Sequence, residues 1–168
     1  MIIRYSDILD GIDQAHEIST KAIKTVIEFS RIGSVTSDDS RIIDMPAGGE
    51  IIIRNSILIK NENTVNRQLI GFGLGEMARH RPHSLLLANN LFFAERDGPN
   101  EVLALPGSPN QSISVAVEEN IIVGRQIIDQ DKFSDDNRFI ENRAELKLEK
   151  ILPEISIIDA LKILEPGN

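Results

Sequence analysis

The sequence has no cysteine and no tryptophan, and only one tyrosine and six phenylalanines among its 168 residues. Without cysteine, a disulfide, a thiolate nucleophile and a cysteine-ligated metal are excluded, so stability must come from packing. Because aromatic residues make up only 4% of the chain, the core must be aliphatic, and few side chains can stack on a sugar or a base. The conspicuous apolar residue is isoleucine, whose β-branched side chain favours strands.

Positive charge is also scarce, with 18 Lys and Arg against 26 Asp and Glu and a formal net charge of −8. Because this charge repels phosphate backbones and anionic headgroups, we expect no nucleic acid and no membrane as partner. No apolar run approaches the ~20 residues that span a bilayer, and the first ten residues do not have the pattern of a signal peptide. We therefore expect a cytoplasmic protein or a component of an assembled particle.

The first 33 residues are predicted to form a short strand and a long helix. Acidic residues precede basic ones between Asp7 and Arg31, an order that complements a helix dipole, and Gly33 would end the helix. Its apolar residues recur at three- and four-residue steps. This face either packs on the protein's own sheet or forms a helix-to-helix contact between subunits. The residues of the candidate interface are Ile8, Ile12, Ala15, Ala22, Val26 and Phe29.

Residues 45–128 are predicted to form a β-rich core. The segment 50–60 is nearly all Ile and Leu apart from a polar break at 54–56, which favours two buried strands around a turn or one strand with a bulge. The Asp-Gly-Pro composition of residues 96–100 favours a hairpin. Residues 51–60 also align without gaps to residues 115–124. Two sheets of a sandwich built from similar hairpins would produce this similarity, and so would chance.

Residues 129–168 are predicted to form a helix and strand segment at the carboxyl end. Ser156 and Asp159 make a capping box ahead of an apolar helical face, whereas the alternation of apolar residues around 144–148 favours an edge strand. The whole chain, 1–168, is then a single domain of the α+β class that is mainly β. We expect a β-sandwich or open barrel of roughly six to eight strands, with a long amino-terminal helix and a short carboxyl-terminal helix.

One stretch has the composition of a weak anion-binding site. Closely spaced glycines after a predicted strand would let backbone amides approach an anion, and the arginines and histidines that follow would add charged donors and proton carriers. The alternative is a bend in the strand followed by a solvated loop with internal salt bridges. The residues of this candidate site are Gly71, Gly73, Gly75, Arg79, His80, Arg81 and His83.

No catalytic motif, cofactor or metal site is predicted, and the acidic run 37–40 is interpreted as a solvated turn. Two functions remain. The first is a non-enzymatic structural or interaction module that forms a homo-oligomer or docks into a larger assembly, such as a viral particle. The second is a binding protein or enzyme for a small anionic ligand, with its site between Gly71 and His83.

Overall fold

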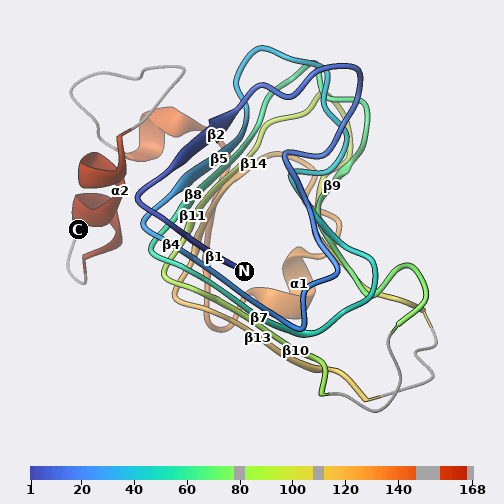
Figure 1. Cartoon of the computed structure of the whole chain (residues 1–168). Coiled ribbons are helices and arrows are strands. Elements are labelled where there is room, and N and C mark those ends of the chain that lie inside the picture. Colours follow the sequence, from blue (N-terminus) through green and yellow to red (C-terminus); the bar gives the residue numbers. More distant parts are fainter. Residues whose placement is uncertain (78–81, 108–111, 147–155, 166–168) are drawn as a thin grey trace.

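The computed structural model describes residues 1–77, 82–107, 112–146 and 156–165, and in them the chain winds through successive coils (Figure 1). Each strand pairs with the equivalent strand of the next coil, and every strand pairing in these ranges is parallel. The result is three parallel sheets around one interior. This is the architecture of a parallel β-helix, a solenoid in which each coil contacts only its neighbours.

The strands are assigned to the three sheets as follows. Sheet A contains β1 (Ile2–Arg4), β4 (Lys24–Glu28), β7 (Glu50–Arg54), β10 (Ser84–Ala88) and β13 (Ser114–Glu118). Sheet B contains β2 (Asp7–Leu9), β5 (Arg31–Ser34), β8 (Ile57–Lys60), β11 (Leu91–Ala94), β14 (Ile121–Gly124) and β15 (Arg138–Ile140). Sheet C contains β3 (Ile18–Ser19), β6 (Ile43–Met45), β9 (Gln68–Phe72) and β12 (Glu101–Ala104).

Helical structure in the described residues is short and lies near the carboxyl end. It comprises α1 (Gln130–Phe133), a 3-10 turn (Arg143–Leu146) and α2 (Ile157–Leu164). The capped carboxyl-terminal helix is confirmed, because the N–H of Asp159 donates to Ser156 Oγ at 3.2 Å. The edge strand expected around 144–148 is wrong where it can be compared, because Ala144 and Leu146 lie in the 3-10 turn.

The predicted amino-terminal helix is wrong, because residues 7–32 form β2, β3, β4 and the start of β5. Several residues in this stretch have a left-handed backbone, including Asp10 (φ 57°), Asp13 (φ 59°) and Phe29 (φ 48°), and such residues interrupt a helix. The three- and four-residue spacing of apolar residues therefore comes from short strands separated by turns. The six residues of the candidate interface consequently share no helical face.

The sandwich or barrel of six to eight strands is also wrong. Strands occur from residue 2 to residue 140, they stack coil upon coil, and their pairing is parallel rather than by hairpins. The expected hairpin around residues 96–100 instead joins β11 of sheet B to β12 of sheet C. The prediction failed because long aliphatic runs are as typical of buried parallel strands as of a sandwich core.

The similarity between residues 51–60 and 115–124 has a structural cause. Ile51 pairs with Leu85 and Leu85 with Val115, while Ile57 pairs with Leu91 and Leu91 with Ile121. The two aligned segments are thus two coils apart in one register, with residues 85–94 stacked between them. The similarity is the signature of a repeat and not of two facing sheets.

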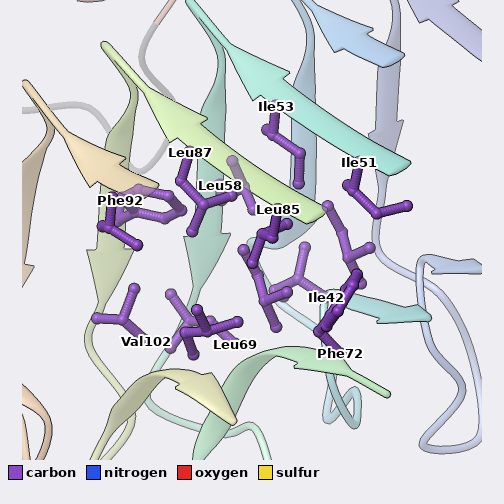
Figure 2. Packing of buried hydrophobic residues seen from close by; sticks show 14 of the residues in the cluster. Ile42, Ile51, Ile53, Leu58, Leu69, Phe72, Leu85, Leu87, Phe92 and Val102 are labelled. Carbon is purple, nitrogen blue, oxygen red and sulfur yellow. The ribbon is translucent and has the colours of Figure 1, made fainter. Parts of the chain in front are cut away.

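The interior of the coils is filled by aliphatic and phenylalanine side chains from all three sheets, as Figure 2 shows for ten labelled residues. A second apolar cluster lies on the outer face of sheet B, where α2 covers it (Figure 1). Ala160 of α2 and Leu146 pack there with Ile59, Leu91 and Val123. Strands β8 and β11 are therefore buried on both faces, which explains why they are almost uninterrupted apolar runs.

A ladder of polar side chains, buried at its four inner positions, runs along the corner between sheets A and B. The backbone N–H of each ladder residue except the last donates to a side-chain oxygen of the equivalent residue in the next coil, at 3.3, 3.2, 3.1, 2.9 and 3.0 Å. The bonded residues are 24, 26, 34, 30 and 17 positions apart in the sequence. The ladder consists of Ser6, Ser30, Ser56, Asn90, Asn120 and Asn137.

Replacing Asn90 by Ala should lower the free energy of unfolding by about 3 kcal/mol, because buried groups lose their hydrogen-bond partners. The Asn90 amide accepts from the N–H of Ser56 and donates to Ile53 O and Asn120 Oδ1. Urea denaturation measures the change. The control Asn63→Ala, at an exposed position, should stay within about 0.5 kcal/mol of the wild type; equal effects of the two variants would contradict the ladder's role.

Candidate functional site: the open edge of the first coil

The predicted anion-binding stretch is only partly described. Gly71 is buried in β9, and Gly73 is a turn residue with φ 69°. His83 is buried, and its Nδ1 accepts the N–H of Gly49 at 3.0 Å, so one ring nitrogen holds the backbone of the preceding coil. Arg79, His80 and Arg81 lie outside the described residues. The anion site as a whole stays a prediction.

Hollows in the described part of the surface lie along the corner between sheets B and C. One, of about 530 Å³, is lined by residues that include Ser40, Arg67 and Arg96. Another, of about 760 Å³, is lined by side chains of both charge signs. Glu95 on its wall is bound by Arg143, with Nη2 at 2.6 Å from Oε2. In the described residues no group of three or more His, Asp or Glu is placed to hold a metal ion.

A lysine is buried in the same corner. Lys60 is fully buried, and its Nζ donates to the backbone oxygens of Ser40 at 2.7 Å and Gln68 at 3.1 Å. Burial, together with the positive charges of Arg96 and Arg41, lowers the pKa of Lys60 to about 7, although the charge of Asp39 opposes the shift. Because the side chain is shielded from solvent, its evident role is to hold the loop at Ser40 against the start of β9 and not to meet a substrate.

The chain covers part of the carboxyl-terminal end of the solenoid, although β12, β13 and β15 are the outermost strands there. The Asp129 carboxylate accepts the N–H groups of Val102 and Leu103, at 3.0 and 2.9 Å, and so caps the last strand of sheet C. Burial raises the pKa of Asp129, against the effect of these hydrogen bonds. Phe133 of α1 packs on the interior cluster, and α1 falls inside the outline of the coils when they are viewed along their axis (Figure 1).

The opposite end is open. Strands β1, β2 and β3 are the outermost strands of sheets A, B and C, and all three belong to the first coil, residues 1–23. In the described chain, each of them pairs with a strand on one side only. An unpaired strand edge presents a row of free N–H and C=O groups and is a template for pairing with another chain.

Large apolar side chains are exposed on the same coil. Their exposed fractions range from 43 to 80%. We call the outward backbone edges of β1, β2 and β3, together with these side chains, the docking edge. Its exposed apolar residues are Met1 (43%), Ile2 (66%), Tyr5 (78%), Ile12 (80%) and Ile23 (66%).

The backbone of β1 shows which groups face outward. Met1 O accepts from the N–H of Val26 at 3.0 Å, and the N–H of Tyr5 donates to Glu28 O at 3.3 Å. Because residues of a strand alternate in the direction of their backbone groups, the N–H and C=O of Ile2 and Arg4 point away from β4. The edge of β1 can therefore accept a further strand without losing a bond to the second coil.

The candidate interface residues are distributed differently from the prediction. Ile8 packs against the interior cluster, Val26 lies in β4, and Ile12 is on the docking edge. The ring of Phe29 stacks on Tyr5, with 5.3 Å between ring centroids. Of these residues, Ile12 is exposed and placed to contact another molecule, whereas Ile8 and Phe29 pack within the protein. Composition alone could not separate them, since exposure here depends on which coil a residue belongs to.

Comparisons with known proteins give no functional lead: the chain matches no family model, no curated protein and no solved structure. No helix in the described residues combines the length and apolar character that crossing a membrane requires. The function must therefore be argued from the geometry of the chain itself.

The buried lysine makes a pH-dependent prediction. Because the folded-state pKa of Lys60, about 7, is below its ordinary value of 10.5, the unfolded chain binds more protons between these two pH values. Stability conferred through this group should thus rise as pH increases from about 7 to about 10.5. Lys60→Met should remove that rise in urea denaturation, whereas Lys132→Met, an exposed lysine on α1, should keep it. An unchanged slope in Lys60→Met would contradict the shift.

Proposed function

We propose that the protein is a non-enzymatic structural module that associates end-on through its docking edge, and that the occupant of this edge is a second copy of the chain. The observation that carries the proposal is the asymmetry of the two ends. In the described residues the outermost strands at both ends pair on one side only, but the first coil adds five large apolar side chains that are 43 to 80% exposed, whereas Asp129 and α1 cover part of the other end.

The two ends allow two forms of assembly. A head-to-tail contact would set the docking edge against the end that Asp129 and α1 partly cover, and would generate an open filament. A contact between two docking edges is isologous, so that both unpaired edges are covered at once and the assembly stops at a dimer. A two-fold axis across the solenoid makes the facing strands antiparallel, which is a favourable pairing.

Apolar burial favours the same contact. Ile2, Ile12 and Ile23 are each at least 66% exposed, and burial of an isoleucine side chain contributes about 1.5–3 kcal/mol. Hydrogen bonds between the backbones of the facing strands would fix the orientation of the two copies, as in other cases of β-strand addition. A role of the dimer within a larger assembly such as a viral particle, and a cytoplasmic location, stay predictions.

Sedimentation velocity over a range of concentrations tests the proposal. The wild type should form a dimer, and Ile2→Lys/Ile23→Lys should raise its dissociation constant at least about tenfold, because two charges would have to be buried. Ile2→Pro should also weaken the dimer, since it removes an outward-facing N–H without breaking a bond to β4.

The matched control is Ile158→Lys, because Ile158 is 68% exposed but lies on α2, away from the docking edge. This variant should dimerise like the wild type. Thermal unfolding should show that all variants remain folded. A wild type that is monomeric at every concentration, or a dimer equally strong in the double variant, would rule out the docking edge as the contact.

A further inference from the structure

Two carboxyl groups meet where the first coil contacts the second. Glu17 lies in the segment that joins β2 to β3, and Asp39 lies in the segment that joins β5 to β6. The two carboxyl groups lie together beneath Gly11, since oxygens of both are within 3.5 Å of the same point beside its backbone. Asp39 is fully buried, and in the described structure no N–H or hydroxyl donor reaches either of its carboxylate oxygens.

The surrounding backbone fits this pair closely. The N–H of Gly11 donates to Glu17 Oε1 at 2.9 Å. A Cβ atom at position 11 would lie 3.4 Å from both Glu17 carboxyl oxygens and 3.5 Å from Asp39 Oδ1. Glycine at this position therefore lets the loop of the first coil lie directly over the two carboxyl groups.

Other charged groups face the pair from neighbouring elements. Asp10 is the nearest further carboxylate. Burial raises the pKa of Asp10, but hydrogen bonds from the N–H groups of Val35, Thr36 and Ser37 outweigh this effect. The pKa of Asp10 is therefore below its ordinary value, and the carboxyl group remains ionised. Lys60, on β8, is a positive neighbour of Asp39, because the charge of Asp39 acts on the pKa of Lys60.

The remaining charged groups in the corner have other partners. Arg41 and Arg96 act on Lys60, and Arg41 Nη1 is 3.2 Å from Asp44. His16 is engaged by the N–H of Arg41 and lies 3.8 Å from Asp44. The charged neighbours that act on the carboxyl pair are therefore Asp10, beside Glu17, and Lys60, beside Asp39.

Burial is the largest cause of the shift in Glu17. Together with the hydrogen bond to Asp39 and the negative charges of Asp39 and Asp10, it raises the pKa of Glu17 to about 8, although the Gly11 N–H opposes this. At neutral pH the pair thus holds one proton, because two adjacent carboxylates cannot both be ionised without strong repulsion.

We propose that this single proton, shared by Glu17 and Asp39, fastens the first coil to the second, and that its loss in alkaline solution loosens the first coil and weakens docking. The part that concerns docking rests on the proposed function; the fastening itself does not. The first coil carries the docking edge, so the proton controls the order of the surface that another molecule would contact.

The direction of the pH dependence follows from linkage. The ordinary pKa of a glutamate is 4.5 and that of Glu17 in the folded protein is about 8, so the folded chain binds more protons between these values. The contribution is fully present below pH 4.5, declines as pH rises to about 8 and is lost above it.

Amide hydrogen exchange at pH 6 and pH 9, corrected for intrinsic rates, tests the fastening directly. The reporters are N–H groups that join the two coils beside the pair: those of Ile18, Thr20 and Ser40, bonded to Ile42 O, Asp44 O and Ala15 O at 3.0 Å each. In the wild type their protection should fall at least about tenfold between the two pH values.

Glu17→Gln and Asp39→Asn keep the shape of the pair but need no shared proton, so both should show little change in protection with pH. Glu62→Gln, at an exposed carboxylate on another coil, should behave like the wild type. A tenfold fall that persists in both Glu17→Gln and Asp39→Asn would overturn the proposal. So would calcium chloride restoring protection in the wild type at pH 9 but not in Asp39→Asn, because a cation would then be the native bridge.

The dimer constant at the same two pH values separates the two proposals. A dimer that weakens at pH 9 in the wild type but not in Glu17→Gln supports the control of docking. If the reporter amides lose protection at pH 9 but the dissociation constant of the dimer stays the same, the proposal that the proton controls docking would be overturned. A wild type that never dimerises contradicts the proposed function, while the exchange measurement still decides whether the proton fastens the coils.

Discussion

The fold depends on a row of hydrogen bonds that ties each coil to the next at one buried corner. In the ladder from Ser6 to Asn137, a side-chain oxygen accepts the N–H of the equivalent residue one coil earlier. At five of these corners the residue before it has a left-handed backbone, with φ from 48° to 56°. A buried turn would otherwise leave polar backbone groups without partners. The ladder therefore lets the chain turn sharply inside the protein and sets the register of sheets A and B together.

The register has different consequences at the two ends of the solenoid. At the carboxyl-terminal end the last ladder residue, Asn137, bonds back to Val117 O and Phe133 O, and the closing segment satisfies exposed backbone groups. At the other end the first coil is held from one side only. Its attachment relies on backbone pairing, on Tyr5 stacked over Phe29 and on the carboxyl pair of Glu17 and Asp39. The coil that carries the docking edge is thus paired with the rest of the solenoid on one side only.

The β-rich character, the aliphatic core and the capped carboxyl-terminal helix could be predicted from the sequence, because each has a local signal. The repeat was harder to detect, although an apolar pair, two residues of varied type, Ser or Asn and further apolar residues recur near positions 2–9, 26–33, 52–59, 86–93 and 116–123. Loops of different length separate these segments, so the repeat has no fixed period in the sequence. Burial of Asp39, in a run expected to be a solvated turn, could not be predicted, since it results from contacts with Glu17 on another coil.

The central claim is that successive coils stack in one register, and the absence of cysteine allows a direct measurement with spin labels on introduced cysteines. Lys24, Glu50, Ser84 and Ser114 are consecutive partners across sheet A. Electron paramagnetic resonance on the pairs 24/50, 24/84 and 24/114 should show separations that increase by about 4.8 Å per strand, the spacing of a β-sheet. Separations that fail to increase in this order would contradict the solenoid and the ladder that holds it.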